Sequence, residues 1–84
     1  MFNAILSSRT SPTISTAATL TIPATAKIVR IQAQTADVRY TVDGTTPSGS
    51  AGFIIAVGEY IDLPVSRPIK LYSATGAAEC VFFE

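Results

Sequence analysis

This sequence contains no histidine, no tryptophan and a single cysteine, Cys80, among its 84 residues. One cysteine cannot form a disulfide within the chain. The absence of histidine excludes Ser–His and Cys–His nucleophile pairs, and with only one cysteine it also argues against a zinc site. We therefore expect Cys80 to behave as a small buried hydrophobic side chain. The sequence predicts a protein that is not an enzyme, with no catalytic residues, no metal site and no cofactor.

Charged residues are scarce. They make up 14% of the chain, and the six basic residues balance the six acidic ones, whereas about 25% is usual. The basic residues are dispersed along the sequence, which argues against nucleic-acid binding. A near-neutral chain has little repulsion between copies, and a domain of this size has a thin core that gains from assembly. We therefore expect protein partners.

Long apolar runs are also missing. Runs such as Phe53–Val57 are far shorter than the about 20 residues that a membrane-spanning helix needs. Met1–Leu6 is apolar, but it lacks the charged start and the length of a signal peptide. The sequence therefore predicts no membrane association.

What the sequence does contain is short runs of alternating apolar and polar residues, separated by Gly, Pro, Asp and Ser. Such runs are typical of β-strands, and no window has the apolar spacing of an amphipathic helix. About seven short strands with regular turn signals favour a small all-β sandwich or barrel. We expect the second and third strands below to pair with each other. The predicted strands are Thr19–Ile22, Lys27–Gln34, Arg39–Val42, Gly52–Val57, Glu59–Leu63, Ile69–Ser73 and Ala77–Phe83.

Residues 1–18 differ from the rest, being rich in Ser, Thr and Ala with one charge, Arg9. One interpretation is a loose terminus. The other is an extended N-terminal arm whose apolar tip, made of Phe2, Ile5 and Leu6, docks on a neighbour. We divide the chain into this arm, 1–18, and a β-sandwich domain, 19–84.

A turn signal follows the alternating residues at 38–42. In Asp43-Gly44, glycine adopts positive φ freely and aspartate bonds its own backbone. Pro47 then holds the preceding residue in an extended conformation. Asp43, Gly44 and Pro47 are therefore predicted to be structural turn residues. Asp43, Thr45 and Thr46 offer oxygens to calcium, but one carboxylate is too few for an ordinary calcium site.

The segment Tyr40–Ser48, YTVDGTTPS, resembles the Tyr-Thr-x-Asp-Gly-x-x-Pro-Thr segment of immunoglobulin-like modules at the C-terminus of chitobiases. Ile69–Ala74 is similar to the strand that follows in those modules. Val38–Phe83 also resembles small bacteriophage head proteins of the decoration, or cement, type. The resemblance implies an immunoglobulin-like sandwich and covers roughly the C-terminal half of the chain, and such a fold hosts many functions.

The phage resemblance implies a structural virion protein that is made in the host cytoplasm and binds the outer surface of a capsid. Its partners would be the major capsid protein and sister copies of itself, as a dimer or trimer. An accessory module normally travels with a catalytic domain, whereas this sequence starts at its own Met1, which favours the coat component. The alternatives are a carbohydrate-recognising accessory module and a head-fibre or tail subunit.

Aromatic residues are the remaining candidates for binding. Tyr40 falls on the apolar face of its strand and is expected in the core, whereas Tyr60 and Tyr72 are expected at the surface in contact with a partner. Adjacent residues of a strand point to opposite faces, so one of Phe82 and Phe83 is left for a partner to cover. We assign Phe83 to the interface, together with Tyr60, Tyr72 and the arm residues Phe2, Ile5 and Leu6.

Overall fold

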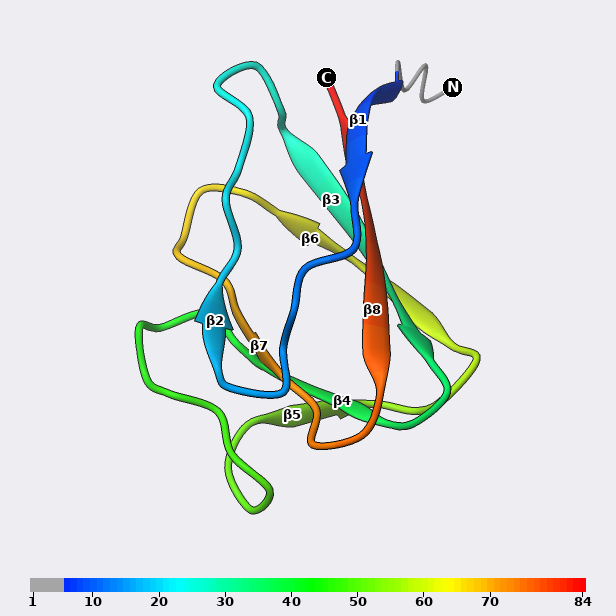
Figure 1. The fold of residues 1–84 in the computed structure, drawn as a ribbon. Coiled ribbons are helices and arrows are strands. Elements are labelled where there is room, and N and C mark those ends of the chain that lie inside the picture. Colours follow the sequence, from blue (N-terminus) through cyan, green and yellow to red (C-terminus); the bar gives the residue numbers. More distant parts are fainter. Residues whose placement is uncertain (1–5) are drawn as a thin grey trace.

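The computed structural model describes residues 6–84, which form eight strands in two antiparallel four-stranded sheets (Figure 1). One sheet, in the order β1-β8-β3-β6, is called the β3 sheet, and the other, in the order β2-β7-β4-β5, is called the β4 sheet. The predicted all-β class and small sandwich are confirmed, with one strand more than expected. The strands are β1 Leu6–Thr10, β2 Ala18–Thr19, β3 Ile28–Gln34, β4 Val38–Thr41, β5 Phe53–Ile55, β6 Tyr60–Pro64, β7 Lys70–Tyr72 and β8 Ala77–Phe83.

The pairing of the central strands can be compared with that of immunoglobulin domains, which it matches in part. The successive strands β3 and β4 lie in different sheets, and they pair with β6 and β7, which are also successive. In immunoglobulin domains, strands B and C pair with E and F in the same way. The last strand differs, because β8 lies between β1 and β3 in the β3 sheet, whereas the last strand of an immunoglobulin domain shares a sheet with C and F.

The connection between β3 and β4 sends the chain from one sheet to the other. The prediction that these two strands pair was wrong, because β3 pairs with β6 and β8 while β4 pairs with β5 and β7. Thr35 has a φ of 66°, which is a rare conformation for a β-branched residue. The amide of Ala36 donates to the carbonyl of Gln34 at 2.8 Å. This tight turn redirects the chain instead of closing a hairpin.

The core lies between the two sheets and is built from alternate residues of the strands. In β3, Val29, Ile31 and Ala33 are fully buried, and in β8 the same alternation buries Ala78, Cys80 and Phe82. Side chains on opposite faces of a strand alternate, so the two longest strands each contribute one complete face. The other members of the core come from both sheets and from the loops: Ile14, Leu20, Ala26, Val38, Ile55, Ile69 and Leu71.

The N-terminal part of the chain contributes to the sandwich. Within the segment assigned to the arm, β1 pairs with β8, and Ile14 is buried in the core. The division of the chain at residue 18 therefore differs from the structure, because Leu6–Thr10 is an edge strand of the β3 sheet. Its polar residues gave no apolar alternation from which a strand could be predicted. Phe2 and Ile5 lie outside the described residues.

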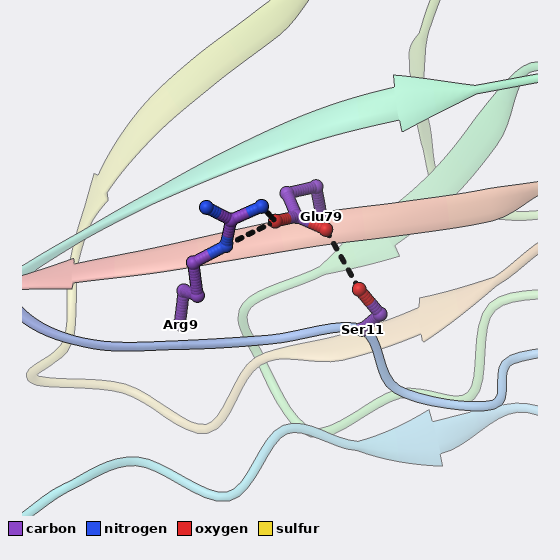
Figure 2. Close-up of polar contacts among 3 residues, drawn as sticks. All are labelled: Arg9, Ser11 and Glu79. Carbon is purple, nitrogen blue, oxygen red and sulfur yellow. Dashed lines mark hydrogen bonds and ion pairs between the residues drawn. The ribbon is translucent and has the colours of Figure 1, made fainter.

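Side chains tie β1 and the segment after it to β8 (Figure 2). The guanidinium of Arg9 donates to Oε1 of Glu79 at 2.6 Å, and the hydroxyl of Ser11 donates to Oε2 of the same residue at 2.7 Å. The hydrogen bond from Ser11, followed by the charge of Arg9, lowers the pKa of Glu79 below its ordinary value. One carboxylate thus holds the beginning of the described chain against its last strand.

Candidate protein-binding surface

The outer face of the β3 sheet brings together side chains from all four of its strands. Arg9, Val81, Arg30 and Asp62 lie opposite one another across the sheet. Since directly opposed residues of antiparallel strands point to the same face, these four form one row. The neighbouring rows are Glu79, Gln32 and Tyr60 on one side and Phe83, Ile28 and Pro64 on the other.

Arg30 is the centre of this face. Its Nε and Nη2 atoms donate to the two carboxylate oxygens of Asp62 at 2.8 and 3.0 Å. Its guanidinium carbon lies 4.3 Å from the ring centroid of Tyr60 and 5.9 Å from that of Phe83. The hydrogen bonds raise the pKa of Arg30 and lower the pKa of Asp62. We call Arg30, Tyr60, Asp62 and Phe83 the Arg30 face.

The cation–π contacts and the two-point ion pair hold these side chains in one arrangement. A planar guanidinium can form a two-point ion pair and lie over an aromatic ring at the same time, whereas an ammonium group cannot form the two-point pair. The side chains of Arg30 and Asp62 are each 44% exposed, and Tyr60 is 53% exposed. The Arg30 face is therefore ordered by its own contacts and still open to a partner.

The structure divides the predicted interface residues between the two sheets. Tyr60 and Phe83 meet on the Arg30 face, and Leu6 pairs with Phe83 at the start of β1. Tyr72 lies on the other side of the sandwich, in β7 of the β4 sheet. As the sequence predicted, Phe82 is buried and Phe83 is only partly buried.

Arg30 and Asp62 were missed by the sequence reasoning. Arg30 belongs to the polar face of its strand, so its orientation could be read from the alternation. Its partners could not, because they are 30 or more positions away in the sequence and are reached only through the pairing of β3 with β6 and β8.

A shallow hollow of about 310 Å³ lies on the outer face of the β4 sheet. Tyr72, Arg39 and Ile54 are opposite one another on three neighbouring strands and line it, together with Asp37. Arg39 donates to the carbonyl of Gly52 at 3.0 Å, and the carboxylate of Asp37 accepts from the amide of Val57 at 2.9 Å. The hollow thus combines an aromatic ring with charged groups of both signs.

The edge of the β4 sheet exposes apolar side chains. Phe53 and Ile54 of β5 are 68% and 54% exposed, and Val57 in the following loop is 53% exposed. The ring of Phe53 has one aromatic neighbour, Tyr40, with the centroids 5.6 Å apart. Tyr40 packs against the core as expected. We call Phe53–Val57 the β5 edge.

The turn after β4 is held by Asp43. Its Oδ1 accepts from the amide of Thr45 at 3.1 Å and from the hydroxyl of Thr45 at 2.6 Å, and these bonds lower the pKa of Asp43. Gly44 has a φ of 88°, and Pro47 is buried. The loop then runs to β5, and the amide of Ser48 donates to the carbonyl of Ala51 at 3.0 Å. These contacts fix the backbone of the turn, and both hydrogen bonds to Asp43 are accepted by its Oδ1 atom.

The reactive groups of the described residues are dispersed. Cys80 is buried in the core, and burial raises the pKa of its thiol to about 12. Thiolate is the reactive form of cysteine, so this side chain is inert at neutral pH. Within residues 6–84, no three side chains of His, Cys, Asp or Glu gather as a metal-binding group. The same part of the chain has no helix that is long and apolar enough to cross a membrane.

Comparison with known proteins finds no matching family model, no similar curated protein and no similar solved structure.

Proposed function

We propose that this protein is a structural virion protein that decorates the outer surface of a phage head and stabilises the shell. The observation that carries the proposal is the Arg30 face, where Arg30 is held by Asp62 and packs against Tyr60 and Phe83. Tyr and Arg are enriched among the residues that dominate protein–protein binding. The resemblance of Val38–Phe83 to small phage head proteins supplies the kind of partner.

The mechanism is mechanical. Side chains that are already fixed lose little conformational entropy on binding, so the ordered Arg30 face favours docking on a rigid shell. Burial of apolar area contributes about 25 cal/mol per Å². A single small contact of this kind is weak, but copies that also contact one another bind a repetitive shell with avidity. Copies placed across subunit junctions would then oppose the separation of capsid subunits.

The proposal predicts that a major capsid protein is encoded beside this protein, and the test is binding to heads assembled from it. Wild type should sediment with these heads and raise the temperature at which they release DNA or subunits. Tyr60→Ala should weaken binding at least about tenfold, since hot-spot truncations cost more than the 1.4 kcal/mol that tenfold represents. Tyr72→Ala is the matched control, because it removes the same ring from the other sheet. Absence of a capsid gene nearby, or equal binding by both variants, would refute the proposal.

The hollow beside Tyr72 favours a second candidate function, recognition of a carbohydrate. Its aromatic ring, Arg39 and Asp37 supply the stacking surface and polar groups that sugar binding uses. A glycan array would separate the two candidates. Binding that is lost in Tyr72→Ala and kept in Tyr60→Ala would favour the accessory-module function over the capsid function.

A further inference from the structure

The β5 edge exposes apolar side chains on both of its faces. Ile54 lies opposite Arg39 on the outer face of the sheet, whereas Phe53 and Ile55 lie opposite Tyr40 and Val38 on the other face. Ile55 is buried, but Phe53 is 68% exposed and Ile54 is 54% exposed. A partner that docks on one face of the sheet would cover only one of these two side chains. A strand added beside β5 would cover both.

The four edge strands of the described sandwich differ in how they are protected against such pairing. β1 carries Arg9, β6 carries Asp62 and ends at Pro64, and β2 has only two residues. Charges, proline and shortness are the usual means of blocking an exposed edge. β5 is also short, with three residues, but the chain from Ala51 to Gly58 has neither a charged residue nor a proline.

We propose that the β5 edge pairs antiparallel with the β5 edge of a second copy of this chain. A two-fold axis at Ile54 would place the two Ile54 side chains opposite each other on the outer face. On the other face, Phe53 of each copy would lie opposite Ile55 of its partner. Aromatic and β-branched residues in such opposed positions stabilise antiparallel strands. The pairing would join the two β4 sheets into one continuous sheet.

We place a second copy of the chain at this edge because a symmetric contact can set identical side chains against each other, and the β5 edge has no charged side chains that would then repel. A two-fold contact places the residue on its axis against its own counterpart. Pairing of the β6 edge about its central residue would set Asp62 against Asp62, and pairing of the β1 edge about Arg9 would set Arg9 against Arg9. At the β5 edge only uncharged side chains meet, and the net charge of each copy is zero. The inference does not depend on the proposed capsid function, since it concerns the isolated protein.

The test uses Ile54→Glu with Thr19→Glu as its matched control. Both changes add one carboxylate to an edge strand of the β4 sheet, and each new carboxylate faces a basic residue on the neighbouring strand, Arg39 or Lys70. The fold of either variant should therefore be preserved. In the proposed dimer, however, only Ile54→Glu places two carboxylates against each other. Circular dichroism should confirm that both variants keep the β-sheet signal.

Sedimentation of the full chain from about 10 µM to about 1 mM covers the range of small, weak interfaces. Wild type and Thr19→Glu should form dimers, and Ile54→Glu should raise the dissociation constant at least tenfold. Monomers of wild type at every concentration would overturn the proposal, as would dimers of undiminished affinity in Ile54→Glu or a loss of dimers in both variants.

Cross-linking provides a second measurement that tests the register. Directly opposed residues of antiparallel strands have Cα atoms about 4.5–5.5 Å apart, which is within disulfide range. Oxidised Ile54→Cys should therefore run as a covalent dimer, whereas wild type should not, because its Cys80 is buried. Thr19→Cys is the control for random collision. Equal cross-linking of Ile54→Cys and Thr19→Cys would contradict the proposed register.

Discussion

On the Arg30 face, charged and aromatic groups are joined to one another, whereas at the β5 edge apolar groups stand without a charged neighbour in their own strand. Arg30 is held by Asp62 and Tyr60, so the face has a defined shape before any partner arrives. Phe53 and Ile54 have a backbone partner on one side only, at β4. The first surface suits recognition of a rigid partner of complementary shape, and the second suits extension of a sheet.

The two surfaces also lie on different sheets, so they are separable by mutation. A partner on the Arg30 face covers β3, β6 and β8, whereas a second copy at β5 extends the β4 sheet. The two proposals are therefore compatible, because a shell and a sister copy would occupy different sheets.

The largest effect is expected for Arg30→Ala. The change removes the ion pair to Asp62 and the cation above the Tyr60 ring, so binding to capsids should weaken by about ten- to a hundredfold. The side chain is half exposed and lies outside the core, so the sandwich should still fold. Self-association through β5 should be unchanged in the same protein. Equal loss of capsid binding and self-association would show that the two surfaces are not separate.

Next in size is Gly52→Ala, which acts on the backbone that leads into β5. Gly52 has a φ of 108°, and a Cβ there would lie 3.0 Å from the carbonyl oxygen of Tyr40 and 3.3 Å from Cβ of Pro47. We expect the free energy of unfolding to fall by about 2 kcal/mol, from strain and overlap together.

The matched control is Gly44→Ala, where φ is also positive, at 88°, but a Cβ would have no atom within 4 Å. Only the conformational penalty remains, about 1 kcal/mol. Urea unfolding followed by circular dichroism measures both changes. An equal loss of stability in the two variants would contradict the close packing of Gly52 against β4 and Pro47.

The smallest effect is expected for Glu79→Gln at the β1 edge. The lowered pKa of Glu79 means that its contribution to stability is present above the unfolded-state pKa, ordinarily 4.5, and is lost as the pH falls through the lower folded-state value. Arg9 is exposed, so the loss should be small. Hydrogen exchange of the β1 amides should speed up at neutral pH, and the difference in Tm from wild type should shrink at about pH 3.

The control for this change is Glu59→Gln, which neutralises an exposed carboxylate in the loop before β6. It should leave the exchange of the β1 amides as in wild type. Unchanged β1 exchange in Glu79→Gln would mean that main-chain pairing with β8 alone holds the edge strand.

Much of the fold could be predicted from the sequence. Period-two alternation and the turn residues between the runs located β3, β4, β5, β6, β7 and β8. In β3 and β8 this alternation matches the burial of one complete face. It failed for β1, whose polar residues have no alternation, and for β2, which the structure places at Ala18–Thr19. The pairing of β3 with β4 was mispredicted because a short connection usually closes a hairpin, whereas Thr35 turns the chain into the other sheet.

The candidate surfaces were less predictable than the fold. Tyr60 and Phe83 could be chosen as exposed aromatics, but the contacts of Arg30 with Asp62 and Phe83 depend on strand pairings over long sequence distances. The sequence predicted a strand at Gly52–Val57, and its consecutive apolar residues Phe53, Ile54 and Ile55 occupy both faces of that strand. That the strand lies at a sheet edge could be learned only from the sheet order.

The central claim, that the Arg30 face binds the outside of a capsid, is tested most directly by electron cryomicroscopy of heads incubated with this protein. The account predicts sandwich density on the outer surface, with β3, β6 and β8 toward the shell and Arg30, Tyr60 and Phe83 at the contact. It also predicts that the density disappears with Arg30→Ala and stays with Tyr72→Ala. Heads without added density, or a sandwich docked through the β4 sheet with the Arg30 face toward solvent, would contradict it.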